Sequence, residues 1–121
     1  MSFETALYNR LSSQLSTTVG TRIYPGTAPQ GTSKPYIVYR KVSAGKEYSH
    51  AGSASLSRDR VQVSVFSTGY LTAKNVVAKV ITAMETATVF QATFKANELD
   101  LYESETKVFH VPVDFFVWHS L

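Results

Sequence analysis

A strict two-residue alternation in residues 58–67 constrains the fold of this chain more than any other feature. Its apolar positions are Val61, Val63 and Val65, and the alternate positions are Arg58, Arg60, Gln62, Ser64 and Phe66. Successive side chains of a β-strand point to opposite faces of the sheet. The segment is therefore predicted to be a strand with one face in the core and a mostly polar reverse face.

Similar alternation predicts the other main strands. In residues 36–42, one face carries Tyr36, Val38, Arg40 and Val42, and the other carries Ile37, Tyr39 and Lys41. In residues 107–119, the apolar face carries Phe109, Val111, Val113, Phe115 and Val117, and the reverse face carries Val108, His110, Pro112, Asp114, Phe116 and Trp118. We also expect a short strand at 22–24 and a long one at 89–101. Proline cannot donate to a strand ladder, so Pro112 predicts a bulge or an edge-facing position.

Two segments show helical periodicity instead. Residues 2–18 repeat an apolar residue every four positions, at Phe3, Leu7, Leu11 and Leu15. Residues 71–87 carry the apolar spacing of one helix face, at Ala73, Val76, Val77, Val80, Ile81 and Met84. The predicted order is α-β-β-β-α-β-β. We expect a single α+β domain over residues 1–121, a two-layer sandwich in which two helices cover one face of a mainly antiparallel sheet.

The connection at residues 25–35 is rich in residues that interrupt helices and strands. It contains Pro25, Pro29 and Pro35 together with two glycines. This composition excludes a helix or a central strand. We predict a surface loop that its prolines hold in a fixed shape.

Residues 44–57 form a second long connection, made mostly of small and polar residues. Its larger side chains are Lys46, Glu47, Tyr48 and His50. We expect a long mobile hairpin loop or arm, and loops of this length without structure are usually functional or disordered. Residues 45–56 are predicted to be mobile in a free subunit and ordered in an assembly.

The composition narrows the classes of protein. The chain has 121 residues, no cysteine and a net charge of +3. This length is enough for one hydrophobic core, and the lack of cysteine excludes disulfides, thiolate zinc sites and cysteine nucleophiles. The small positive charge is weak evidence for a nucleic-acid partner. No apolar run approaches the ~20 residues of a membrane span, and the first residues do not resemble a signal peptide. We expect a protein made in the cytoplasm that does not contact a membrane.

Residues with catalytic or metal-binding chemistry do not cluster in a known pattern. His50, His110 and His119 lack the spacing of a zinc site. The acidic residues of the last turn are Glu98, Asp100, Glu103 and Glu105. We expect this turn to be exposed, whereas catalytic carboxylates need perturbing burial. The sequence therefore predicts no catalytic, cofactor-binding or metal-binding residue and no enzymatic activity, because an unrecognised enzyme would need a convergent buried polar site.

The reverse face of the predicted sheet is the surface that suggests a function. Its aromatic and arginine side chains are of the types that protein interfaces favour. The candidate subunit or partner interface consists of Tyr36, Val38, Arg40, Arg58, Arg60, Phe116 and Trp118. An alternative is a small nucleic-acid-binding module, in which the arginines contact phosphates and Tyr36 and Trp118 stack on bases. Ordinary surface apolarity, or a strand register shifted by one residue, would also explain the pattern.

Three segments resemble a known family. They are residues 22–32 with 34–39 (Arg-Ile-Tyr-Pro-Gly-Thr-Ala-Pro-Gln-Gly-Thr and Lys-Pro-Tyr-Ile-Val-Tyr), residues 60–66 (Arg-Val-Gln-Val-Ser-Val-Phe) and residues 113–118 (Val-Asp-Phe-Phe-Val-Trp). In this order, between two helices, they resemble the tail completion proteins of long-tailed bacteriophages, also called tail terminators or tail-to-head joining proteins. The proline loop is the most specific part of the resemblance, which spans nearly the whole chain.

The resemblance implies an α+β virion protein without catalytic residues. It implies a hexameric ring at the tail–head junction that caps the tail tube, ends its polymerisation and joins it to the head connector. The implied partners are further copies of the chain, the major tail tube protein and a connector or stopper protein. Genomic DNA would pass through the lumen of the ring without specific binding.

Overall fold

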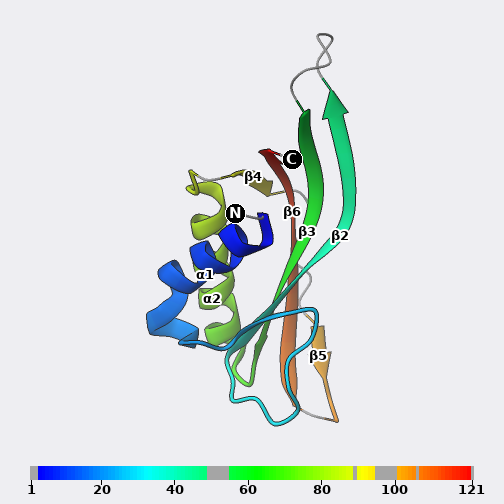
Figure 1. The fold of residues 1–121 in the computed structure, drawn as a ribbon. Coiled ribbons are helices and arrows are strands. Elements are labelled where there is room, and N and C mark those ends of the chain that lie inside the picture. The colour runs from blue at the N-terminus through cyan, green and yellow to red at the C-terminus, as the bar shows by residue number, and fades with distance from the viewer. Residues whose placement is uncertain (1–2, 49–54, 89, 95–100, 106, 121) are drawn as a thin grey trace.

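The computed structural model describes residues 3–48, 55–88, 90–94, 101–105 and 107–120. Its elements are α1 (Phe3–Val19), β1 (Ile23–Pro25), β2 (Tyr36–Tyr48), β3 (Ser55–Ser67), α2 (Tyr70–Glu85), β4 (Gln91–Phe94), β5 (Leu101–Glu103) and β6 (Val108–Ser120). Figure 1 shows both helices on one face of the sheet. The predicted α+β class and the two-helix layer are confirmed.

The six strands form one sheet in the order β1-β2-β3-β6-β4, with β5 also paired to β6. Only β1 pairs in parallel, with β2, and all other pairs are antiparallel. Two parts of the strand expected at 89–101 are described, and both pair with β6. Residues 91–94 lie opposite Phe115 to Trp118 and residues 101–103 lie opposite Val108 to His110, while residues 95–100 lie outside the described residues.

Pro112 lies between these two halves of β6. The register between β3 and β6 runs without a shift across Pro112, which lies opposite Ser64. On the other side of β6, no described strand pairs with residues 111–114. The β3–β6 ladder therefore has no bulge at Pro112, and the residues that follow Phe94 along the other side of β6 lie outside the described residues.

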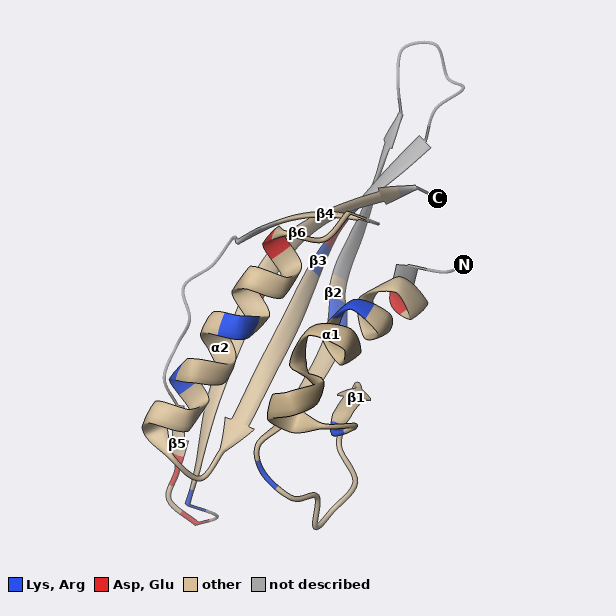
Figure 2. Ribbon diagram, turned by 90° about the vertical axis from the view of Figure 1, so that its left-hand side faces the viewer, with Lys and Arg blue, Asp and Glu red and all other residues tan. Residues whose placement is uncertain are grey.

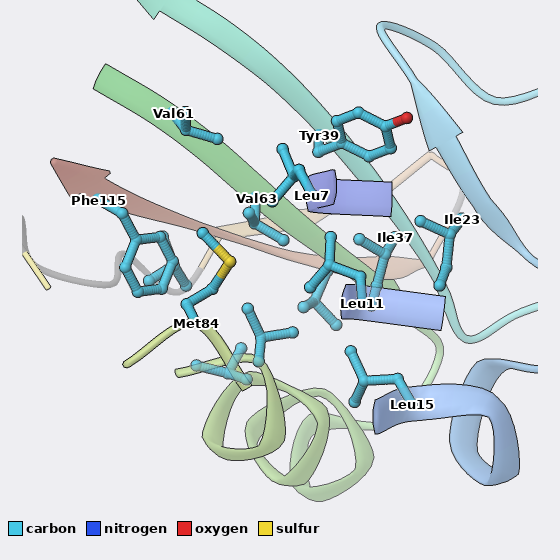
Figure 3. Packing of buried hydrophobic residues seen from close by; sticks show 14 of the residues in the cluster. Leu7, Leu11, Leu15, Ile23, Ile37, Tyr39, Val61, Val63, Met84 and Phe115 are labelled. Atoms are coloured by element: carbon cyan, nitrogen blue, oxygen red, sulfur yellow. The ribbon is translucent and has the colours of Figure 1, made fainter. Parts of the chain in front are cut away.

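The core fills the space between the sheet and the helices. Figure 3 shows Leu7, Leu11 and Leu15 of α1 pointing toward the sheet, with Met84 of α2 beside Phe115. Both predicted apolar stripes are buried. The fully buried side chains include Leu7, Leu11, Leu15, Val19, Ile37, Val61, Val63, Val65, Val76, Val77, Met84 and Phe115. Burying side chains of this size stabilises the fold by roughly 1.5–3 kcal/mol each before entropy is counted.

Polar contacts join the two helices at their ends. Arg10 of α1 donates through Nε to the carbonyl of Ala83 at 2.8 Å and through Nη2 to Thr86 Oγ1 at 2.7 Å. A cation at this position complements the negative end of the α2 dipole. The α1 helix ends at Gly20, whose φ of 61° suits glycine. The outer surface of the helix layer carries only scattered charges (Figure 2).

The hairpin loop or arm expected at 44–57 is largely a paired β-hairpin, so the predicted loop is too long at both ends. Strands β2 and β3 remain paired from Tyr36↔Phe66 to Tyr48↔Ser55. Small and polar residues do not prevent pairing, because backbone groups form the ladder. Lys46, Glu47 and Tyr48 therefore lie in β2, while His50 lies outside the described residues, as do all of 49–54. Figure 1 shows this hairpin extending beyond the helix layer.

A bulge lies in β2 at the base of the hairpin. Lys41 pairs with Val61, but Ser43 pairs with Arg60, so Val42 is an extra residue. The alternation predicted for residues 36–42 therefore holds only to Lys41. Beyond it the two faces exchange parity, because one inserted residue turns each following side chain to the opposite face.

Candidate assembly interface

The reverse face, defined as the sheet face opposite the helices, carries the predicted interface residues. In β2, Ile37 and Tyr39 point into the core. Alternation therefore places Tyr36, Val38 and Arg40 on the reverse face. The same holds for β3 and β6, because the core residues Val61 and Phe115 pair directly. Cross-strand pairs bring the predicted residues of three different strands together, and these residues divide into three groups.

The first group is an aromatic row across four strands. Tyr36 of β2 stacks on Phe66 of β3 with ring centroids 4.8 Å apart, and Phe66 stacks on His110 of β6 at 4.2 Å. Tyr24 of β1 meets Tyr36 edge to face at 6.5 Å. Stacked aromatic pairs contribute about 0.5–1.5 kcal/mol beyond their buried area. The row therefore stabilises the subunit itself, and Tyr36 is only partly exposed.

The second group is a polar network in the middle of the reverse face. Asp114 of β6 is 6 % exposed and accepts hydrogen bonds from two β3 side chains. Arg60 donates to Asp114 Oδ2 through Nη2 at 2.5 Å and through Nε at 3.2 Å, and Gln62 Nε2 donates to Oδ1 at 3.2 Å. Arg40 of β2 donates to Gln62 Oε1 at 3.3 Å. The positive charge of Arg60 is thus balanced within the subunit.

The third group, here called the arginine band, consists of Arg58, Phe116 and Trp118. The guanidinium carbon of Arg58 lies 5.1 Å from the centroid of the Phe116 ring, which is cation–π geometry. Phe116 and Trp118 lie 6.2 Å apart in a tilted arrangement. Arg58 is exposed and both aromatic rings are partly exposed. This band is the open part of the predicted interface.

The proline loop lies beside the aromatic row. Its two ends are fixed by the Gly26 N–H, which donates to the Tyr39 carbonyl at 2.9 Å, and by Arg22 Nε, which donates to the Pro35 carbonyl at 3.0 Å. Thr32 also hydrogen-bonds the Pro29 carbonyl. Pro25 ends β1, and Pro35 precedes β2 directly. The prolines alone predicted a loop of fixed shape, and these hydrogen bonds restrain it further.

The proline loop, β5 and the aromatic row line a half-open cavity of about 350 Å³, here called the loop-covered cavity. Its lining residues are Gly26, Thr27, Ala28, Lys34, Tyr36, Val38, Arg40, Ser64, Phe66, Glu103, Val108 and His110. Val38 is only 8 % exposed, so this predicted interface residue is buried in the subunit. Sequence reasoning missed the cavity because it forms only where distant segments meet.

His110 lines this cavity in an unusual electrostatic setting. Its Nε2 is buried without a hydrogen-bond partner among the described residues. Burial lowers the pKa of His110 below its ordinary value; Arg40 acts in the same direction, and Glu103 opposes it. Burial, assisted by the charge of Glu103, raises the pKa of Tyr36. Near neutral pH the imidazole is therefore uncharged, which suits its stacking on Phe66.

Sequence reasoning also missed a buried carboxylate, Asp59, on the helix side of the sheet. Asp59 has 0 % exposure, and its Oδ2 lies 2.6 Å from His119 Nε2 and 3.2 Å from Lys41 Nζ. The sequence did contain the signal. In β3 and β6, one further step of the alternation beyond Val61 and Val117 places Asp59 and His119 on the core face. Three strands thus converge on one buried acid near the base of the hairpin.

A group of exposed apolar residues was missed as well. The residues are Tyr70 (45 % exposed), Leu71 (74 %), Leu101 (39 %) and Tyr102 (53 %). Tyr70 of α2 and Tyr102 of β5 both contact Phe109, with ring centroids 5.6 and 4.7 Å apart. Leu101 pairs with His110 and therefore points to the reverse face, so these residues do not form one patch.

The described residues offer little for catalysis or metal binding. Within the described ranges, no cluster of three or more His, Asp or Glu residues suits a metal ion. Glu103 and Glu105 are exposed, and Glu98 and Asp100 lie outside the described residues. Neither described helix is long and apolar enough to cross a membrane.

Comparison with known proteins agrees with this organisation. The family model described as Tail completion protein gp17 matches residues 5–120, almost the whole chain. The chain belongs to this family. It is thus a structural protein of the phage tail, and the predicted resemblance is confirmed.

A solved structure shows the same fold. A chain in "Virion of native gene transfer agent (GTA) particle" superimposes with a TM-score of 0.71, at 17 % sequence identity, over 98 % of this chain and 95 % of that chain. Among curated protein sequences, none matches. The tail completion fold therefore accommodates widely different sequences, and its residue contacts must be argued from this chain itself.

Proposed function

We propose that the protein caps the phage tail tube as a ring, ends tube polymerisation and joins the tail to the head connector. Membership of the tail completion family supports a role at the end of tail assembly. The ring partners would be further copies of this chain, in a number of six that the family resemblance implies. The tail tube protein and a connector or stopper protein would bind the two ends of the ring.

The observation that carries this proposal is the arginine band on the reverse face. The helices cover one face of the sheet, and the proline loop and β5 cover one end of the other, which leaves Arg58, Phe116 and Trp118 open. Arginine and aromatic residues dominate the binding energy of protein interfaces. In a ring, this surface of one subunit would meet a different surface of the next, and such a heterologous contact closes if the rotation permits.

The geometry also supports contact through the hairpin. Strand β1 pairs only with residues 37–39 of β2, so from residue 40 onward β2 has a described partner on one side alone. An open strand edge of this length binds other chains readily. The bulge at Val42 and the exposed Lys41 beside it limit uncontrolled pairing. We infer that the hairpin contacts a neighbouring subunit and is the element whose exchange protection increases on assembly.

The alternative of a nucleic-acid-binding module is less well supported by the charges. Asp114 pairs with Arg60 on the same face, and Glu103 lines the loop-covered cavity. Carboxylates at these positions would repel phosphates. A virion protein through which DNA passes without specific binding is consistent with the mild net charge of +3.

The test is the length of tail tubes. Tubes polymerised from the tail tube protein are incubated with and without this protein, and their lengths and ends are measured by electron microscopy. Added protein should stop elongation and leave a ring at one end of each tube. Unchanged elongation with bare tube ends would refute the proposed cap.

A further inference from the structure

The loop-covered cavity is electrostatically incomplete. Two cations, Lys34 and Arg40, and one carboxylate, Glu103, line it. Arg40 donates to the neutral amide of Gln62, and Lys34 makes no hydrogen bond or ion pair within the described ranges. The described lining residues therefore carry a net charge of +1, from two positive charges and one negative charge. A single anionic group would complete it.

The cavity walls define the kind of anion. Tyr36 and Phe66 form one wall with stacked rings, and Val38 adds apolar surface beside them. These apolar walls and the two cations match a side chain in which methylene groups carry a terminal carboxylate. The methylene groups would contact the rings, and the carboxylate would pair with Arg40 and Lys34. Phosphate or sulfate would leave the apolar wall without a partner. The matching protein side chain is glutamate.

A second copy of this chain can supply that glutamate. The exposed glutamates without a partner among the described residues are Glu4, Glu85 and Glu105. Glu4 and Glu85 lie in the first turn of α1 and the last turn of α2. They belong to the helix layer, which a heterologous ring contact would bring against the reverse face of the next subunit. The buried carboxylates Asp59 and Asp114 are already paired within the subunit.

We propose that the loop-covered cavity receives a glutamate side chain, Glu4, Glu85 or Glu105, from a second copy of this chain, held by Arg40 and Lys34. The proposal rests on the ring of the proposed function and names one contact between its subunits. The proline loop then has a specific role, because it positions Lys34 at the cavity and closes one side of it. The imidazole of His110, in the cavity wall, reports whether an anion is bound.

Charge reversal tests this contact in the assembled tail. Arg40→Glu should lower the fraction of tail tubes that carry the protein at one end at least tenfold. A second substitution is then added to Arg40→Glu. One of Glu4→Arg, Glu85→Arg or Glu105→Arg should restore the fraction of capped tubes to within twofold of the wild-type value. Arg40→Lys, which keeps the positive charge at the cavity, is the matched control and should leave that fraction within twofold of the wild-type value. Full capping by Arg40→Glu, or rescue by none of the three reversals, would overturn the inference.

A second experiment uses the free wild-type protein and does not depend on ring formation. Propionate is the probe for a glutamate side chain, and propionamide is its neutral control. Propionate should shift the NMR signals of the His110 ring saturably and raise the pKa of His110, because a nearby anion favours the imidazolium. Equal shifts with both probes, or none with either, would refute the anion site. If wild-type protein still caps tubes in that case, the proposed function survives and only this inference fails.

Discussion

Arg60 and Asp114 form an ion pair on the open face of the sheet, with Nη2 of Arg60 2.5 Å from Oδ2 of Asp114. The pair joins β3 to β6 and lies between the aromatic row and the arginine band. One end of the reverse face is therefore closed by stacking and by the proline loop, while the other end stays open. The two ends are expected to respond differently to substitution, the first in stability and the second in assembly.

Removal of the Asp114 carboxylate should destabilise the subunit. Asp114→Ala leaves Arg60 and Gln62 without their acceptor, and hydrogen bonds to charged groups contribute about 1.5–3 kcal/mol. Because the Arg60 side chain is 39 % exposed, solvent screening reduces the loss, and we expect about 1–2 kcal/mol. Urea unfolding measures this change. Glu105→Ala, at an exposed acid, should stay within about 0.5 kcal/mol. Equal effects of the two substitutions would contradict the structural role of the pair.

Two leucines of the helices should differ sharply in their contribution to stability. Leu11 is 0 % exposed and Leu71 is 74 % exposed. Leu11→Ala should lower the free energy of unfolding by roughly 2–5 kcal/mol, because it leaves a cavity between α1 and the sheet. Leu71→Ala should change it by less than about 0.5 kcal/mol. Thermal unfolding followed by circular dichroism compares them, and a similar loss in both would show that the core is placed wrongly.

The stability of the subunit should depend on pH through His110. Its pKa is lowered by burial in the folded state, so below about pH 6.5, the ordinary value, the unfolded chain binds a proton that the folded chain refuses. The free energy of unfolding therefore falls as the pH drops through this range. His110→Phe keeps an aromatic ring beside Phe66 but cannot titrate, so it should lose less stability between pH 7.5 and 5.5. All other side chains are the same in both proteins, so the comparison isolates position 110. Equal losses would contradict a buried neutral imidazole.

Substitution in the arginine band should impair assembly more than folding. Arg58 is exposed and lies over the ring of Phe116. Arg58→Ala should leave the melting temperature within a few degrees, yet weaken binding to tail ends by about 2 kcal/mol, or roughly 30-fold, as for a central interface arginine. Lys107→Ala, at an exposed cation in the turn between β5 and β6, is the matched control. Occupancy of tail ends is counted by electron microscopy at graded protein concentrations. Unchanged binding by Arg58→Ala would exclude Arg58 from the interface.

The amide exchange of the hairpin tests its role in assembly. Residues 45–56 were predicted to be mobile in the free subunit, yet 45–48 and 55–56 already pair in it. We therefore expect partial protection of the paired amides in the free protein, and further protection across 45–56 in assembled tails. Hydrogen exchange with mass spectrometry measures both states. The same protection in each would show that no neighbour contacts the hairpin.

Local patterns were sufficient to predict the strands that face the core and both helices. The alternation of Val61, Val63 and Val65 places β3 in the sheet, because burial of one face fixes the side-chain parity. The same argument places Trp118 on the reverse face, and the structure agrees. It fails at Val42, where a bulge shifts the register. Periodicity cannot detect an extra residue among small side chains with no buried face.

The contacts that depend on distant segments could not be predicted. The loop-covered cavity needs Lys34, His110 and Glu103, which come from three separate parts of the chain. The alternation of residues 89–101 did predict that both β4 and β5 lie in the sheet, where they pair with successive halves of β6. Asp59 was overlooked, since a charged residue is not expected on a core face. It is tolerated there because His119 and Lys41 pair with it.

The most direct test of the ring is an image of the tail–head junction in the complete particle, at a resolution that places side chains. We predict a closed ring of copies of this chain, in which Arg58, Phe116 and Trp118 of each subunit are covered by the next subunit. A junction in which that face of the sheet is in contact with solvent alone would contradict the account.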